Sequence, residues 1–445
     1  MTSRYVSIRP DNIPSDGKIS FKNGFPVLSF TIQAQNGILN PESIRIAGQA
    51  RFYKDNQSPP TPVLTADPNE VSMDNRLGIY NLWDQVIIRH NKSKQICEHI
   101  RHYPRYLSSY LGLGSSKQDL MGHMGQSNLI MPNSDAFFET VMCGNVNDTK
   151  VNDFSCYLPT GFLRSGNMIN LMEQSFGGIQ IEIHLSPDQN ALLSRTGSST
   201  NILDAHYVLE NLELTFEVSD VPAEEQARMA SQTQGSLSFN TIQTLYTSIN
   251  STNAQIQFNL GLKAVQSIFM NFCPSGNINT ITANGNATTY PSFNATAADA
   301  LGIAHFKRVQ FLRGGVKYPL EYDIVTNIDK DPNTKVVDPE LLKHFVESVI
   351  PEFMTDRTSV SSQNNNRRYN LGAGANSYLD VGDGGALFGI GIKYSQFNQG
   401  QDFSSAQWGC SLESNLTSDN PISVFIYVKA RATLLWGPNG IQLMQ

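Results

Sequence analysis

Residues 207–218 read YVLENLELTFEV, and from Leu212 to Val218 apolar side chains alternate with polar ones. A side-chain period of two places one face of an extended chain on a core and the other in water, which is typical of antiparallel β-strands. The same alternation recurs in four other stretches: Leu28–Ile32, Ile179–Leu185, Ile256–Leu260 and Ile390–Tyr394. The sequence therefore predicts an all-β protein.

The composition supports this prediction and excludes several classes of protein. Of the 445 residues only 16% are charged, while 40 are Asn, 43 are Ser and 33 are Gly. A coiled coil would be rich in Ala, Glu, Lys and Leu, and a disordered chain would have fewer aromatic residues than the 23 Phe and 16 Tyr present here. The formal net charge of −7 argues against a dedicated nucleic-acid binder, which usually carries a basic surface. A loop-rich β protein remains.

The pattern also divides the chain into two similar halves. Each half begins with strand-like stretches, contains one helical stretch, and ends with a long strand-like stretch, Tyr207–Val218 in the first and Val424–Trp436 in the second. Tight turns between strands are predicted by Asn-Gly and Asp-Gly pairs, which begin at Asp16, Asn23, Asn36, Asn284, Asp383 and Asn439. We predict two tandem domains, residues 1–218 and 241–445, joined by a connector at 219–240.

Three helices are predicted in this β framework. Asp338-Pro339-Glu340 is a start signal, followed by apolar residues at helical spacing up to Ile350. A second helix is predicted over Ser93–Leu111, with a kink at Pro104. A third, from Pro222 to Thr233, has only a thin apolar face and is interpreted as a solvated connector.

The sequence nominates no catalytic, cofactor-binding or metal-ligating residue. Neither His-Glu-x-x-His nor Gly-x-Ser-x-Gly is present. His99 and His102 lie beside Glu98 in the second predicted helix, but a transition-metal site needs a further ligand and supporting contacts. We interpret these three residues as an ordinary polar helix face.

Three other segments have a structural interpretation. Gly112–Lys117 lacks the spacing of a phosphate loop and follows a helix, so we expect a helix end and a turn. Asp380 and Asp383 do not match a calcium loop, which favours a glycine-rich hairpin. Asn364–Arg368 contains a single Arg pair, which favours an exposed loop over a nucleic-acid site.

Cysteine usage and hydropathy bear on the compartment. The chain has five widely spaced cysteines and no Cys-x-x-Cys pair, so we expect free thiols and synthesis in a reducing compartment, the cytoplasm or the nucleus; they are Cys97, Cys143, Cys156, Cys273 and Cys410. The first ten residues contain no apolar segment, so no secretory signal is expected. The longest apolar stretches, such as Ile422–Val428, are far shorter than the ~20 residues of a transmembrane helix, so none is expected.

Several segments, taken in order, resemble one family, the double jelly-roll major capsid proteins of double-stranded DNA viruses. The resemblance is to those of small eukaryotic viruses of the polinton-like and virophage kind. It rests on IPSDGKISFKNGFPVLSFTI (13–32), GILNPESIRIAGQARFY (37–53), CYLPTGFLRSGNMINLMEQSFGGIQIEIHLSP (156–187) and YVLENLELTFEVSDVP (207–222). In the second half it rests on FLRGGVKYPLEYD (311–323), the helix before Ile350, and VFIYVKARATLLW (424–436).

The resemblance implies a fold and a function. The fold would be two tandem eight-stranded jelly rolls with a few short helices in loops. The chain would be a structural major capsid protein, with no enzymatic activity and no cofactor, that forms a homotrimer with the outline of a hexamer and tiles an icosahedral shell. Its partners would be neighbouring capsomers and penton or minor capsid proteins, without specific nucleic-acid binding, and its location the virion. Loops 113–150 and 274–300 would form the outer surface.

Two other functional classes fit a tandem β protein. One is a carbohydrate- or receptor-binding β-sandwich of the fibre or lectin kind. The other is a polysaccharide- or glycan-processing enzyme, which needs two carboxylates about 5–10 Å apart. No pair of carboxylates in this sequence is singled out by its surroundings.

Overall fold

A computed structural model describes most of the strands and the helices between them. The described residues are 2–55, 58–62, 71–73, 77–114, 127–130, 151–173, 175–194, 205–258, 260–275, 306–325, 339–350, 389–394, 400–414, 421–437 and 440–445. Within these ranges the chain is mostly β, with a few short helices, as the sequence predicts.

A six-stranded sheet forms the outer layer of the first half. Its order is β1-β12-β3-β4, and β8 and β9 also pair with β3. The strands are β1 (Ser3–Ile8), β3 (Ile38–Lys54), β4 (Thr61–Pro62), β8 (Val151–Tyr157), β9 (Ile169–Asn170) and β12 (Ala205–Ser219).

A nine-stranded sheet runs through both halves of the molecule. Its order is β19-β15-β21-β13-β7-β6-β10-β2, with β22 added beside β21. The first half contributes β2 (Val27–Ile32), β6 (Trp83–His90), β7 (Ile96–Ile100) and β10 (Ile179–Leu185). The second half contributes β13 (Gly235–Ile249), β15 (Val265–Pro274), β19 (Ile390–Lys393), β21 (Ile422–Gly437) and β22 (Gly440–Met444).

A five-stranded sheet completes the second half. Its order is β14-β20-β16-β17, with β18 beside β16. Its strands are β14 (Asn253–Gln257), β16 (Phe306–Arg313), β17 (Val316–Lys317), β18 (Ile324–Val325) and β20 (Trp408–Ser414), and a separate small sheet pairs β5 (Val71–Ser72) with β11 (Leu193–Ser194).

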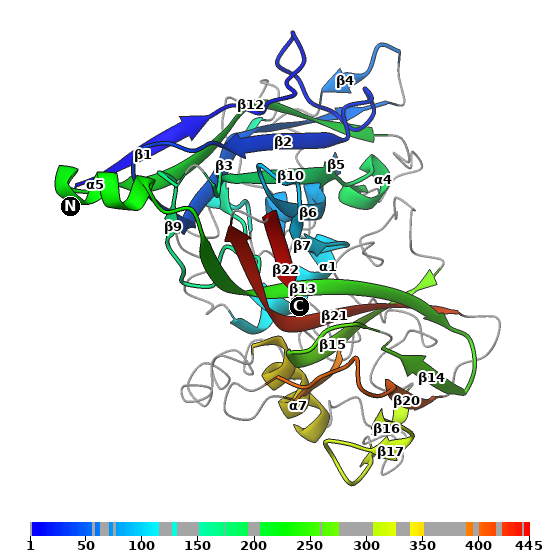
Figure 1. Ribbon diagram of the computed structural model, residues 1–445. Helices are drawn as coiled ribbons and strands as arrows, with labels where there is room; N and C mark the ends of the chain where they lie inside the picture. Colours follow the sequence, from blue (N-terminus) through cyan, green and yellow to red (C-terminus); the bar gives the residue numbers. More distant parts are fainter. Residues whose placement is uncertain are drawn as a thin grey trace.

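The three large sheets make two sandwiches that share the nine-stranded layer (Figure 1). In the first sandwich, Leu28 of β2 and Phe216 of β12 belong to one buried apolar cluster. In the second, Val424 of β21 and Leu412 of β20 belong to another. Each sandwich therefore has a core formed by side chains from two facing sheets.

Strand β12 shows how the sequence sets the register. From Leu212 to Val218 every second residue is buried, as the alternation predicts. Before that stretch all of Ala205–Leu209 is buried, but the two residues with no exposed surface are the odd-numbered Tyr207 and Leu209, so the phase shifts by one residue. The shift coincides with an irregularity in the pairing with β3, and Asn211 there has a φ of 52°. A β-bulge explains the phase change, because one extra residue turns all later side chains to the other face.

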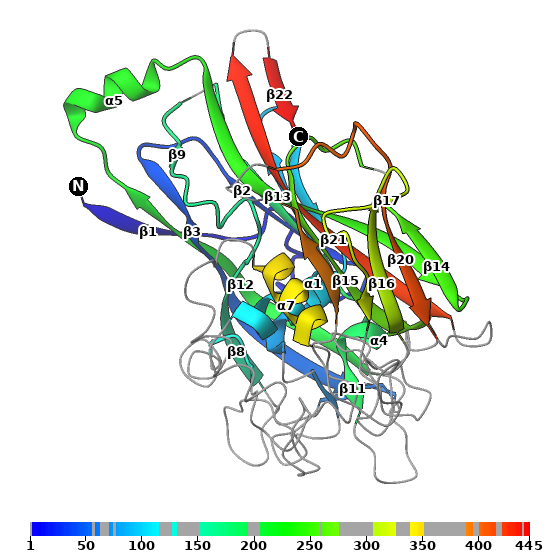
Figure 2. The ribbon, with the colours of Figure 1, turned by 90° about the horizontal axis from the view of Figure 1, so that it is seen from below.

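The helices are short and lie between strands. They are the 3₁₀ helix η1 (Gly78–Leu82), α1 (Tyr103–Gly114), α4 (Asp188–Ala191), α5 (Ala223–Ala230) and α7 (Pro339–Val349). Helices α1 and α7 lie side by side against the nine-stranded sheet (Figure 2). The predicted helix before Ile350 is confirmed, and so is the solvated connector helix, since α5 has no buried residue. None of the described helices is both long enough and apolar enough to span a bilayer.

The predicted helix over Ser93–Leu111 is wrong in its first part. Ile96–Ile100 is strand β7, which forms a hairpin with β6 through a turn in which Lys94 has a φ of 58°. A spacing of four residues between Ile96 and Ile100 fits one helical turn, but it is also a multiple of the two-residue strand period. The helix begins only at Tyr103, so Pro104 stands in its first turn, where proline is tolerated without a kink.

Strand β12 ends at Ser219 and β13 begins at Gly235, with α5 between them. The whole of β13 pairs with β21 of the second half, and one parallel pairing, Gln243 with His99, joins it to β7. The division into residues 1–218, 219–240 and 241–445 stays a prediction.

Candidate functional site

The junction between the two sandwiches contains a buried carboxylate, Glu98 on β7. Its side chain accepts hydrogen bonds from three backbone N–H groups: Gly161 N at 3.0 Å, Phe162 N at 2.9 Å and Ile242 N at 2.8 Å. The first two donors belong to a loop of the first half, and the third belongs to β13 of the second. Glu98 therefore ties the two halves together at the point where, among the described residues, a single backbone pairing joins β7 to β13.

The environment of Glu98 alters its acidity. Burial raises the pKa of Glu98 from its ordinary value to about 7, although the three backbone N–H groups and Thr160 favour the charged form. Residue 161 must be small, because a Cβ there would lie 2.6 Å from the carbonyl oxygen of Asn240 and 2.8 Å from Glu98 Oε1. The glycine thus permits the close approach of this loop to β13.

Helix α1 provides a second polar link across the junction. Arg105 is buried, with its guanidinium group 4.3 Å above the Phe425 ring and one nitrogen 3.3 Å from Cys273 Sγ. Asn271 of β15 donates to the backbone oxygen of Arg105 at 2.6 Å and accepts a hydrogen bond from Ser109 at 2.9 Å. These contacts fix α1 of the first half against strands of the second.

Aromatic side chains pack between α1 and the strands of the second half. Tyr106 lies 5.7 Å from Tyr427 and 6.1 Å from Phe269 between ring centres, and Tyr427 donates to the backbone oxygen of His102 at 2.9 Å. At the other end of the junction, the Trp436 indole donates to Glu173 and its ring packs on Phe176 at 5.0 Å. Apolar contact and directed hydrogen bonds together indicate a rigid junction.

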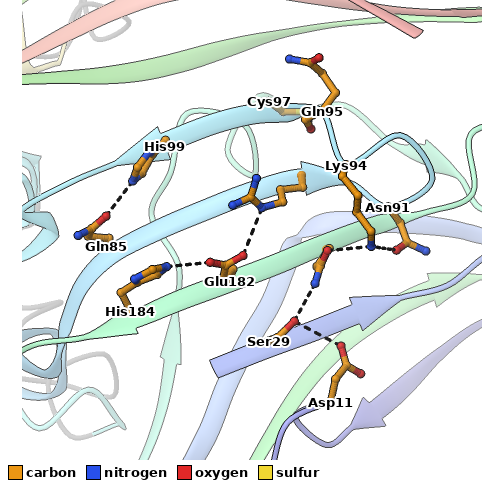
Figure 3. Close-up of polar contacts among 12 residues, drawn as sticks. Asp11, Ser29, Gln85, Asn91, Lys94, Gln95, Cys97, His99, Glu182 and His184 are labelled. Atoms are coloured by element: carbon orange, nitrogen blue, oxygen red, sulfur yellow. Dashed lines mark hydrogen bonds and ion pairs between the residues drawn. The ribbon is translucent and has the colours of Figure 1, made fainter. Parts of the chain in front are cut away.

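The face of the nine-stranded sheet that points away from the first core carries a polar network (Figure 3). Glu182 of β10 bonds to His184 at 2.8 Å and to Arg89 of β6 at 3.2 Å. Burial alone would raise the pKa of Glu182, but the hydrogen bond from His184 and the charge of Arg89 outweigh it and lower that pKa. His99 lies 2.9 Å from Gln85, and burial lowers the pKa of His99 to about 4.

The N-terminal segment covers the open edge of this sheet at β2. Asn12 donates to the backbone oxygen of Val27 at 2.6 Å and accepts from the N–H of Ser29 at 3.0 Å. Asp11 adds a backbone bond to Ser29 and a side-chain bond to Thr31. Side chains thus satisfy backbone groups that would otherwise invite pairing with another strand.

The three residues weighed as metal ligands are not brought together. Glu98 turns into the junction, His99 bonds to Gln85, and His102 lies in the turn after β7 with its ring 4.7 Å from Phe425. No group of three or more His, Cys, Asp or Glu side chains that could hold a metal occurs within the described ranges. The sequence predicts Glu98 on a polar helix face, which is wrong; one of the contacts that hold it in the junction is with Ile242, 144 positions away.

The other sequence candidates fall partly outside the described residues. Helix α1 is described as far as Gly114, and residues 115–117 lie outside the described residues, so the helix end and turn expected at Gly112–Lys117 stay a prediction. Asp380, Asp383 and Asn364–Arg368 lie outside the described residues, as do most of loops 113–150 and 274–300. Four of the five cysteines are described, and all four are buried free thiols.

Comparison with known proteins identifies the fold. No protein-family model and no curated protein matches this sequence. Among solved structures, the PBCV-1 virus capsid matches with a TM-score of 0.59 and 11% identity, covering 100% of this chain and 97% of that one. The Faustovirus major capsid protein matches at 0.56 with 10% identity (98% and 90% covered), and a capsid chain of the Sputnik virophage at 0.52 with 10% identity (99% and 88%). The predicted double jelly-roll fold is confirmed.

Proposed function

We propose that this chain is a structural major capsid protein that builds the shell of a virus particle. The observation that carries the proposal is a shared double jelly-roll fold that spans nearly the full length of this chain and of viral capsid chains. A local likeness of one sandwich would be weak support, because β-sandwiches serve many functions. Here both sandwiches and their mutual arrangement are shared.

The architecture suits a building block. A continuous nine-stranded sheet and the Glu98 and Arg105 contacts hold the two jelly rolls as one unit. Three such chains around a threefold axis would present six similar sandwiches, which gives a trimer with a hexagonal outline. Such a block tiles a closed shell through repeated contacts between copies.

The proposal extends to partners and location. The trimer would contact neighbouring capsomers and penton or minor capsid proteins in the virion, after synthesis in a reducing compartment of the host. It would have no enzymatic activity and no specific affinity for nucleic acid. The low content of charged residues supports close packing of many copies, because identical surfaces with few charges repel one another little.

Light scattering on the purified full chain tests the assembly state. We expect a particle of three times the 49.2 kDa chain mass, with a hexagonal outline in negative-stain electron micrographs. A stable monomer at micromolar concentration would refute the proposal. Glycan-array binding by a protein that does not assemble would favour the receptor-binding alternative, and hydrolysis of a polysaccharide would favour the enzyme.

A further inference from the structure

A cavity of about 260 Å³ opens at the junction between the two jelly rolls. Its walls come from both halves: helix α1 and the loop after β8 on one side, and strands β13 and β21 on the other. Glu98 fixes two of these walls, since it accepts hydrogen bonds from Gly161 and Ile242, which both line the cavity. The cavity is therefore preformed, and it lies at a domain interface, where small-molecule sites often occur.

The cavity lining is cationic. Arg164 and Lys429 line it, and none of the lining residues that the structure describes carries a carboxylate. The Arg164 guanidinium packs 5.3 Å above the ring of Tyr157, and within the described ranges it has no ion pair with an acidic side chain. Arg164 is exposed, so its planar fork of N–H donors is available to an incoming group. Lys429 is buried on β21 and donates to the backbone oxygen of Val349.

The rest of the lining is aromatic and neutral polar. Tyr106 and Tyr110 stack at 5.6 Å between ring centres and form one wall. Thr160 and Asn240 add a hydroxyl and an amide on the loop and on β13. A cavity of ~150 Å³ is large enough to hold benzene, so the volume here accommodates a flat ring together with a charged head group.

From this arrangement we propose that the junction cavity binds a small organic anion, a planar carboxylate with a flat apolar body. The carboxylate would lie against the Arg164 guanidinium, whose geometry matches two carboxylate oxygens. The apolar body would lie against Tyr106 and Tyr110. Because both jelly rolls line the cavity, such a ligand would also strengthen their junction.

Calorimetric titration of the full-length protein with benzoate tests this site. Benzyl alcohol serves as a neutral ligand of similar shape, and acetate as a head group without the ring. We expect benzoate to bind with a Kd of about 1 mM or below, at least ~10-fold more tightly than either control ligand. Equal affinity for benzoate and benzyl alcohol, or no measurable heat with benzoate, overturns the proposal.

Two variants locate the binding. Arg164→Met keeps much of the side-chain length and removes the charge, and it is expected to weaken benzoate binding about 10-fold or more. Asn240→Asp places a negative charge in the opposite wall and is expected to weaken it similarly. Arg228→Met, on the exposed helix α5, is the matched control and should leave binding unchanged. Benzoate affinity that survives Arg164→Met and Asn240→Asp contradicts a site in this cavity.

Discussion

Replacing Glu98 tests whether one buried carboxylate joins the two jelly rolls. Glu98→Ala leaves three buried N–H groups, those of Gly161, Phe162 and Ile242, without their acceptor. Each such loss costs about 1–3 kcal/mol. Water entering the vacated space offsets part of that cost, because a polar cavity can hold it. We therefore expect a destabilisation of about 3–5 kcal/mol, at the upper end of single substitutions.

Glu98→Gln is the finer perturbation because it preserves shape. Gly161 and Ile242 share Oε1, so an amide oxygen placed there keeps both bonds. The amide NH₂ then faces the N–H of Phe162, which loses its acceptor. The expected cost is about 1–3 kcal/mol, the penalty for one buried donor left unpaired.

The pH dependence gives a second, independent readout. Burial raises the pKa of Glu98 to about 7 in the folded chain, above its ordinary value of 4.5. The folded state therefore binds this proton more tightly than the unfolded state does. The resulting stabilisation is complete below about pH 4.5 and is lost as the pH rises through 7, by about 3 kcal/mol in total. Gln does not titrate, so only the wild type loses stability as the pH rises. The difference in the free energy of unfolding between the wild type and Glu98→Gln should therefore shrink between pH 5 and pH 8.5.

Scanning calorimetry on the wild type and both variants at the two pH values measures these effects. Glu224→Gln, on the exposed face of α5, is the control for loss of one negative charge. If Glu98→Ala lowers the unfolding temperature no more than this control does, Glu98 does not hold the junction. A difference between wild type and Glu98→Gln that stays constant with pH would refute the titration argument.

Three further predictions concern other parts of the fold. Gly178→Ala should lower the free energy of unfolding by several kcal/mol, because φ at this residue is +87° and a Cβ would lie 2.0 Å from a carbonyl oxygen of β2. The control Gly17→Ala, at a residue with φ of +70° and open space around it, should lower it by only about 1 kcal/mol. Chemical denaturation measures both values. Asn12→Ala should expose the β2 edge, cost about 1–2 kcal/mol and raise the aggregation rate followed by turbidity, whereas unchanged turbidity would contradict an edge-covering role. Burial raises the pKa of Cys97 to about 12, so its thiol stays protonated and unreactive in the folded protein. In a Cys143→Ser background, Ellman's reagent should therefore react with the remaining cysteines only after unfolding, and rapid labelling of the native protein would contradict this.

The sequence predicts the elements whose cause is local. Leu212–Val218 alternates strictly, and its even-numbered residues are the buried ones. Asp338-Pro339-Glu340 is a helix start signal, and α7 begins at Pro339. In both cases the signal lies within a few residues, as a side-chain period or a start signal, and the structure follows it. The helix prediction for Ile96–Ile100 is wrong because the apolar spacing there fits both the helical and the strand period. The pairing of β6 with β7 in a hairpin selects the strand.

The amino-acid sequence alone determined that this chain is a β protein with two similar halves and an exposed helical connector. The tertiary structure decided how the halves meet. Glu98 shows the reason, because a carboxylate in a strand is equally compatible with a solvated face and with a buried junction between domains. The choice depends on donors at residues 161, 162 and 242, and no local pattern encodes contacts over such separations. The junction cavity depends on the same distant contacts, because its walls meet only once both jelly rolls have packed.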